Sequence, residues 1–223
     1  MNPIPEDLRD IPLRIAEAAP EHAGIPIAVT NPWSGETLAR VATVNAAGVE
    51  AALRHAAHLH ADRGGWLPKR ERIAILTRAA AIMEERAEML ARVASAEGGK
   101  PLIDSRIETA RAIDSLRLCI HALRENDAAP PGMDVNAASA GRLAWIRREP
   151  VGVVLAFSAF NHPLNLIAHQ VGPAVAAGCP VIVKPAETTP LSCAALTGIL
   201  EEAGLPRGWC QMLLTESHAL SGR

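Results

Sequence analysis

The 223-residue chain contains no tyrosine and only 2 phenylalanines, so it lacks the aromatic side chains on which single-stranded nucleic acids stack. It also has almost no excess of charge, because 22 basic and 24 acidic residues leave a formal net charge of −2. Such a chain has no overall field that would attract nucleic acid or an anionic membrane surface. We therefore expect neither of them as a partner.

Neither a membrane-spanning segment nor a secretory signal is visible. No apolar run reaches the roughly 18 residues that a membrane helix needs, and no apolar stretch follows a basic start. Cysteines are few, and no two of them form a CxxC pair: Cys119, Cys179, Cys193 and Cys210. Widely separated cysteines in apolar surroundings are typical of reduced, buried thiols inside cells, so we expect a globular cytoplasmic protein.

The first 44 residues divide into two parts. Residues 1–24 are rich in proline, alanine and charge, which favours a loosely ordered arm. Residues 25–44 contain two β-prone runs on either side of the sequence NPWSG (31–35). Because this pentapeptide has the chemistry of a turn, we predict a β-hairpin.

A helical block follows the hairpin. Asn45 is a suitable N-cap for a helix over 46–61, and another helix is predicted over 103–125. Between them, Pro68 begins one long amphipathic helix that ends near the glycine pair at 98–99. Its apolar side chains recur at spacings of three and four residues: Ile73, Leu76, Ala80, Met83, Ala87, Leu90 and Ala94.

Strand patterns dominate the second half of the chain. The segment GRLAWIRREP (141–150) is basic, which predicts an edge or interface strand. The next run, VGVVLAF (151–157), is apolar without alternation, as in a strand buried on both faces. Two further strands are predicted at PVIVK (180–184) and WCQMLLT (209–215).

Helical segments separate the last three of these strands. One helix is predicted over 163–177, with a kink at Pro173 and an end at Gly178. A second begins at Thr189-Pro190 and ends at Gly204-Leu205-Pro206. Strand–helix–strand–helix–strand with short loops predicts a right-handed parallel βαβαβ unit, which is half of a doubly wound nucleotide-binding sheet.

Polar side chains follow two of the predicted parallel strands. Ser158 to Pro163 come after the first strand, and Lys184 to Glu187 end the second. Ligands of open α/β sheets bind beyond the carboxyl ends of the strands, so both loops are expected at one edge. An amide, an ammonium and a carboxylate then converge there, which suits a polar ligand with hydroxyls and phosphates.

Three stretches resemble the aldehyde dehydrogenase superfamily: PVGVVLAFSAFNHPLN, AVAAGCPVIVKPAETTPLS and EEAGLP, in this order. The resemblance extends back through NPWSGETLARV and through AEGGKPLID, which is similar to the family's ETGKP segment. It covers about residues 25 to 215, and the FN-x-P and KPAE motifs at this spacing are its specific part. The chain has no GxGxxG motif, and this family does not use one.

The resemblance implies an α/β chain forming the N-terminal part of the aldehyde dehydrogenase fold, with a β-hairpin and helices packed on a partial parallel, Rossmann-like sheet. An arm at 1–24 precedes the hairpin and helical part of the cofactor-binding domain at 25–139. An oligomerisation or bridging strand at 140–150 leads into the first βαβαβ half of the NAD(P)-binding sheet at 151–223. A homo-oligomer is implied for the full-length form.

Asn161 matches the family's oxyanion asparagine. In such enzymes a cysteine thiolate attacks an aldehyde, and hydride then leaves to NAD(P). The side-chain amide donates a hydrogen bond to the oxyanion without titrating. The structural alternative is that Asn161 caps the turn before Pro163, a role that asparagine often takes.

Lys184 and Glu187 match the family residues that hold the adenosine ribose of the cofactor. Because a carboxylate repels a 2′-phosphate, Glu187 favours NAD, with NADP possible. The alternative is a solvated Lys/Glu pair at a strand end. The remaining cofactor contacts implied are Ser158, Ala159 and Phe160 on the nicotinamide side, with Pro185 and Ala186 between the ribose residues.

Two other features invite a functional interpretation. The histidines of RHAAHLH, at positions 55, 58 and 60, have no further ligand at a suitable spacing nearby, so we expect a solvated helix face and no metal. Cys179 resembles a small residue of the family rather than its nucleophile, and a buried, inert thiol is expected there.

The family's Gly-rich turn, general-base glutamate and nucleophilic cysteine have no counterpart in these residues, so the catalytic domain is expected to be absent. Two hypotheses follow. The chain supplies the N-terminal part of an NAD(P)-dependent aldehyde dehydrogenase, with a small-molecule aldehyde as substrate, and is inactive alone because acyl chemistry needs the nucleophile. Alternatively, it is a truncated, catalytically inactive protein that binds nucleotide weakly or pairs with a full-length subunit through GRLAWIRREP.

Overall fold

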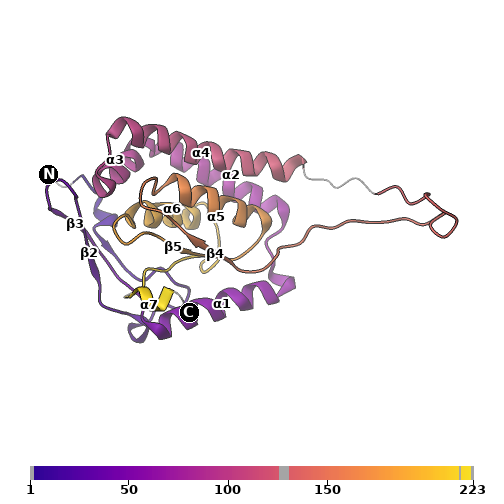
Figure 1. Ribbon diagram of the computed structural model, residues 1–223, viewed down its shortest axis with the longest axis horizontal. Coiled ribbons are helices and arrows are strands. Elements are labelled where there is room, and N and C mark those ends of the chain that lie inside the picture. The colour runs from indigo at the N-terminus through magenta and orange to yellow at the C-terminus, as the bar shows by residue number, and fades with distance from the viewer. Residues whose placement is uncertain (1–2, 126–130, 216, 222–223) are drawn as a thin grey trace.

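The computed structural model describes residues 3–125, 131–215 and 217–221. At its centre is a parallel sheet in the order β4–β5–β6, formed by Val154–Phe157, Val181–Lys184 and Cys210–Met212. Helices α5 (Asn165–Ala177) and α6 (Leu191–Glu202) connect these strands (Figure 1). The predicted βαβαβ unit is confirmed. Both helices lie on one face, because right-handed crossovers move across the sheet in a single direction.

Helices from the first half of the chain enclose this unit. Helix α1 (Ala46–Ala61) lies across β5 on the face opposite α5 and α6 (Figure 1). Helices α2 (Lys69–Glu85), α3 (Ala87–Gly98) and α4 (Leu102–Glu125) form an outer layer packed on α5 and α6. Short 3-10 turns η1 (Glu6–Leu8), η2 (Pro20–His22) and η3 (Arg63–Gly65), with helix α7 (His218–Ser221), complete the helical elements described.

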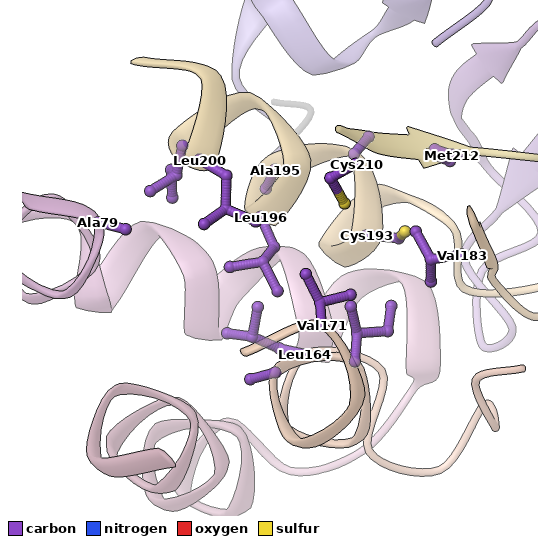
Figure 2. Packing of buried hydrophobic residues seen from close by; sticks show 14 of the residues in the cluster. Ala79, Leu164, Val171, Val183, Cys193, Ala195, Leu196, Leu200, Cys210 and Met212 are labelled. Carbon is purple, nitrogen blue, oxygen red and sulfur yellow. The ribbon is translucent and has the colours of Figure 1, made fainter. Parts of the chain in front are cut away.

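The main core lies between the sheet, its crossover helices and the outer layer. Figure 2 shows Leu164 and Val171 of the α5 region packed below Leu196 of α6, beside the thiols of Cys193 and Cys210. Burial raises the pKa of Cys210 to about 12 and that of Cys193 well above its usual value. All four cysteines are free, as predicted, but Cys119 is only half-buried.

The hairpin prediction is confirmed. Strands β2 (Ile27–Thr30) and β3 (Thr37–Val41) pair antiparallel around the NPWSG turn, in which Gly35 has a φ of 70°. The predicted N-cap is also present, because the Gly48 amide donates to Oδ1 of Asn45 over 3.0 Å.

The single long helix predicted from Pro68 to Gly98 is wrong. The helix ends at Glu85 and a new one begins at Ala87, with Arg86 at φ −103° and ψ 15° between them. One non-helical residue shifts the apolar periodicity very little. The apolar residues from Ile73 to Ala94 therefore keep the spacing of a single helix in the sequence. The Arg86 guanidinium, turned out at this break, forms two hydrogen bonds of 2.7 and 2.8 Å with Glu202.

The prediction of a loosely ordered arm over residues 1–24 is also wrong. Strand β1 (Asp10–Ile11) pairs parallel with β3, and Arg14 bridges to Met212 at the outer edge of β6. Four apolar side chains of the arm are almost fully buried: Ile4, Leu8, Ile11 and Ile15. Burial of these side chains stabilises an ordered conformation, although the proline, alanine and charge content of the arm predicted a loose one. Each side chain packs into a core that the rest of the chain supplies.

Two strand predictions around Pro150 need correction. Residues 142–150 form no strand, and Figure 1 shows residues 131–150 extending away from the body; Leu143 is wholly exposed. The strand expected to be buried on both faces is the edge strand β4, and Leu155 and Phe157 are each 52% exposed. Within the described chain, residues 142–150 have no strand to pair with, and β4 pairs only with β5. The local sequence pattern therefore predicted a strand and a degree of burial that depend on partners it does not specify.

Helix α5 begins at Asn165 and continues through Pro173 to Ala177. Strand β6 is shorter than the predicted 209–215. Across the described ranges, no helix has both the length and the apolar character to cross a membrane.

Candidate functional site

The two loops predicted to form a site start side by side. Phe157 of β4 pairs in parallel register with Lys184 of β5, and the Ser158 amide donates to the Lys184 carbonyl over 3.0 Å. The expectation that both loops share one edge of the sheet is therefore confirmed. The physical reason is that parallel strands in register end at the same level.

The side chains of these loops differ in exposure. The first loop is open, since Ala159, Phe160 and Asn161 are exposed. In the second loop Lys184, Ala186 and Glu187 are half-buried and Pro185 is buried. The site thus has an exposed amide on one side and a partly sheltered ammonium and carboxylate on the other.

Asn161 is bound through its backbone and not through its side chain. Its carbonyl accepts a hydrogen bond from Nζ of Lys100 over 3.2 Å. Its side-chain amide has no hydrogen-bond partner within residues 3–125, 131–215 and 217–221. A cap on the following turn would need a hydrogen bond between the Asn161 side chain and the backbone, and the described residues show none. The side-chain amide is therefore available to a ligand.

The cap of helix α5 comes from another helix. Oε1 of Glu108, in α4, accepts the amides of Leu164 over 2.8 Å and Asn165 over 3.0 Å. Its other oxygen forms an ion pair with Lys100. Glu108 is 1% exposed, so the carboxylate is held by amides that a helix N-terminus leaves unpaired and by a cation.

Glu97 caps helix α6 in the same manner. Its oxygens accept the amides of Leu191 (2.7 Å) and Ser192 (2.9 Å), and also the Ser192 hydroxyl (2.5 Å). Burial raises the pKa of Glu97 to about 7, although the hydrogen bonds from Ser192 and Leu191 and the nearby Lys100 oppose that rise. Helices α5 and α6 therefore both begin on buried carboxylates beside the candidate site.

Lys100 lies between these features. Its side chain is 16% exposed, and burial lowers its pKa while Asp104 and Glu97 act to raise it. Nζ lies 3.3 Å from Nδ1 of His162. Burial, and after it the charges of Lys100 and Arg111, lower the pKa of His162, which favours the neutral imidazole next to the ammonium.

The histidines of helix α1 lie apart from this constellation. His60 stacks on Trp66 with ring centroids 5.8 Å apart, and Nδ1 of His55 lies 4.0 Å from Glu17. Among the described residues, no group of three His, Cys, Asp or Glu side chains could hold a metal ion. Cys179 is buried, at 1% exposure.

Sequence reasoning missed Glu97, Lys100 and Glu108. A signal was present, because Glu97 follows Leu90 and Ala94 on an apolar helix face and Glu108 precedes the apolar residues on the buried face of α4. A carboxylate within an apolar stripe is expected to be buried and therefore paired. Its partners are distant in sequence, so the pattern could not name them.

Comparison with known proteins gives consistent matches. A sequence model of the aldehyde dehydrogenase family matches residues 19–222. An aldehyde-dehydrogenase-like protein of Sinorhizobium fredii is 35% identical over 193 residues, which are 86% of this chain and 37% of that protein.

Solved structures match the fold closely. Aldehyde dehydrogenase 21 of Physcomitrella patens, in complex with succinate, has a TM-score of 0.87 and 29% identity, over 96% of this chain and 44% of that one. The NADP-dependent glyceraldehyde-3-phosphate dehydrogenase of Bacillus halodurans, complexed with NADP, has a TM-score of 0.85 and 28% identity, over 96% and 45%. The chain spans less than half the length of each of these relatives.

Proposed function

Since the chain belongs to the aldehyde dehydrogenase family, we propose that it takes part in the NAD(P)-dependent oxidation of an aldehyde to a carboxylic acid. In this proposal it supplies the oxyanion donor and part of the dinucleotide site. The observation that carries the proposal is the junction of β4 and β5. There the loop after β4 carries the exposed amide of Asn161, which has no hydrogen-bond partner among the described residues. The loop that carries Glu187 begins at Lys184, which pairs in register with Phe157.

In the proposed reaction a thiolate adds to the aldehyde carbonyl and forms a thiohemiacetal whose oxygen carries the negative charge. Nδ2 of Asn161 donates a hydrogen bond to that oxygen. Loss of hydride from the same carbon leaves a thioester, which water hydrolyses to the acid. A fixed, neutral donor stabilises the charge as it develops and needs no proton transfer of its own.

In this proposal the second loop binds the ribose of the dinucleotide. The ammonium of Lys184 donates to hydroxyls, and the carboxylate of Glu187 accepts from them, at the strand ends where such ligands bind. NAD(P) held there would supply the acceptor for the hydride that leaves the substrate carbon. We propose that Glu187 favours NAD by repelling a 2′-phosphate. The remaining proposed contacts are Ser158, Ala159 and Phe160 for the nicotinamide side, and Pro185 and Ala186 for the ribose side.

The burial of the cysteines and the raised thiol pKa values of three of them make a catalytic nucleophile among them unfavourable. Cys179, Cys193 and Cys210 are buried, and burial raises the pKa of Cys193 and Cys210, as well as that of the half-buried Cys119. A reactive cysteine needs a lowered pKa and access to substrate. We therefore propose that these residues contribute the donor and the cofactor contacts, and that the thiolate comes from another part of the enzyme.

A second candidate function is that of a catalytically inactive protein that binds nucleotide and associates with further subunits. The exposed segment 140–150 favours association, because Leu143 and Trp145 are 101% and 88% exposed among basic residues. Apolar side chains presented in this way mark interaction surfaces. In the aldehyde dehydrogenase proposal the same segment joins copies of the chain.

The test is an assay of the protein made from its native gene, together with its intact mass. Aldehyde-dependent reduction of NAD, strongly decreased by Asn161→Ala, would support the dehydrogenase. Binding of NAD in calorimetry without any reduction would favour the inactive, nucleotide-binding protein. Absence of both binding and reduction would remove both candidates.

A further inference from the structure

Rate enhancement by an oxyanion donor depends on how well that donor is fixed before the reaction. No side-chain contact fixes the amide of Asn161, because this side chain is exposed and has no hydrogen-bond partner in the described chain. Its orientation therefore depends on the backbone around it. The backbone is held from outside the loop, by Lys100.

Three hydrogen-bonding groups surround Nζ of Lys100. They are the Glu108 carboxylate, the Asn161 carbonyl at 3.2 Å and Nδ1 of His162 at 3.3 Å. An ammonium has three N–H donors, and each of them has an acceptor when the imidazole is neutral with its proton on Nε2. The side chain of Glu108 is wholly buried, which places the ion pair away from the screening that weakens surface pairs.

The same ion pair also holds the far side of the loop. Through its other oxygen, Glu108 accepts the amides of Leu164 and Asn165, at 2.8 and 3.0 Å. Segment 161–165 is therefore bound at its beginning by Lys100 and at its end by Glu108. The peptide carbonyl of Asn161 is held, while its side-chain amide has no hydrogen-bond partner in the described ranges.

We propose that Lys100 is a positioning residue for the oxyanion donor: its ammonium, anchored by Glu108, fixes the backbone of Asn161 so that the side-chain amide points at the reacting oxygen. This inference rests on the oxyanion role proposed above for Asn161. In this proposal Lys100 acts through the Asn161 backbone and not by contact with the aldehyde or the cofactor. Its effect should therefore disappear when the Asn161 amide is removed.

A purely structural role must be separated from this one, because Lys100→Met alone leaves the buried Glu108 charge unpaired and destabilises the fold. The double variant Lys100→Met/Glu108→Gln removes both charges. It keeps an oxygen that can accept the Leu164 and Asn165 amides. The matched control is Arg106→Met/Glu88→Gln, which removes an exposed ion pair with contacts of 2.8 and 2.9 Å that also involves α4.

The experiment measures kcat, KM for NAD and Tm for these variants, each with and without Asn161→Ala, in the protein made from its native gene. The double variant should lose roughly 10- to 100-fold in kcat, as misplacement of a catalytic group does, with KM for NAD unchanged. In the Asn161→Ala background the same change should have almost no further effect. The conservative variant Lys100→Arg should lose less kcat than the double variant. The control Arg106→Met/Glu88→Gln should keep the kcat of the wild type.

A second measurement needs no activity. In protein labelled with [15N]asparagine, the side-chain amide signal of Asn161, assigned by its absence in Asn161→Ala, should show faster local motion in the double variant than in the control. Equal losses of kcat in both Asn161 backgrounds, or an unchanged amide signal, would overturn the positioning role. An inactive wild-type protein would instead overturn the proposed function, and the amide signal would still decide the role of Lys100.

Discussion

Glu97 in α3 and Glu108 in α4 occupy equivalent places at the beginnings of two different helices. Each buried carboxylate accepts two consecutive backbone amides, those of Leu191 and Ser192 at α6 and those of Leu164 and Asn165 at α5. Such contacts satisfy amides that a helix N-terminus leaves unpaired. When the carboxylate is ionised, it also places negative charge at the positive end of the helix dipole.

Two arginines of α2 hold the opposite ends of the same helices. Arg72 donates to the Ala176 carbonyl near the end of α5, and Nε of Arg78 donates to the Ala203 carbonyl after α6 over 2.7 Å. Each crossover helix is thus held at both ends by charges of the sign that its dipole favours. The loops at the carboxyl ends of β4 and β5 are consequently followed by helices that are held at both ends.

The oxyanion role of Asn161 predicts a loss of turnover without a loss of cofactor binding. Asn161→Ala should lower kcat by about 10²–10³-fold, the usual effect of removing one oxyanion donor, and should leave the Kd for NAD nearly unchanged. Asn161→Asp keeps the shape, removes the donor and adds a negative charge, so its turnover should fall as well. Steady-state kinetics and calorimetry check this, and unchanged turnover in both variants would remove Asn161 from the mechanism.

The ribose role of Glu187 predicts a change in cofactor preference. Glu187→Gln should weaken NAD binding and raise the affinity for NADP relative to NAD, because the 2′-phosphate no longer meets a negative charge. Calorimetric Kd values for both cofactors measure the ratio. The exposed Glu36→Gln serves as control for a general loss of charge. If both variants leave the ratio where it was, the carboxylate does not face the ribose.

The environment of Glu97 predicts a dependence of stability on pH. Burial raises its pKa from 4.5 to about 7, so the folded protein binds this proton more tightly than the unfolded chain does. The contribution is fully present below about pH 4.5 and is lost as the pH rises through about 7, with a total of about 3 kcal/mol or less. The Ser192 hydroxyl donates to the ionised carboxylate over 2.5 Å, which opposes the rise in the pKa of Glu97.

Urea unfolding at several values between about pH 5 and pH 8 measures this effect. The difference in unfolding free energy between wild type and Glu97→Gln should fall as the pH rises, because glutamine does not titrate. A difference that stays constant, or that grows with pH, would show that the carboxyl is ionised throughout this range.

Gly99 predicts a stability effect that depends on packing as well as on backbone conformation. It ends α3 at a φ of 67°, and a Cβ there would overlap Cγ of Pro32 and approach Nε1 of Trp33 to 3.0 Å. Gly35 has a similar φ of 70° with nothing near a Cβ. Gly35→Ala should therefore lose only the backbone term of about 1–2 kcal/mol, and Gly99→Ala should lose clearly more in urea unfolding.

Local chemistry determined much of the architecture. The NPWSG turn, the N-cap at Asn45 and the alternation of apolar runs with helical segments were sufficient to predict the hairpin, α1 and the βαβαβ unit. They also placed the Asn161 and Lys184 loops at one edge, because parallel strands of one sheet end on the same side. These features depend on residues close in sequence, where periodicity and turn chemistry act.

Tertiary structure decided the features that depend on distant partners. Glu108 meets Leu164, Glu97 meets Leu191, and the arm residue Arg14 bridges to Met212, each across a long stretch of chain. No local pattern specifies such contacts, because the same local sequence is compatible with many different arrangements of the helices and strands. The sequence by itself determined the hairpin, α1, the parallel βαβαβ unit and the loops that carry the candidate site. Only the packing of α3 and α4 against α5 and α6 determined how Lys100 and Glu108 hold that site in place.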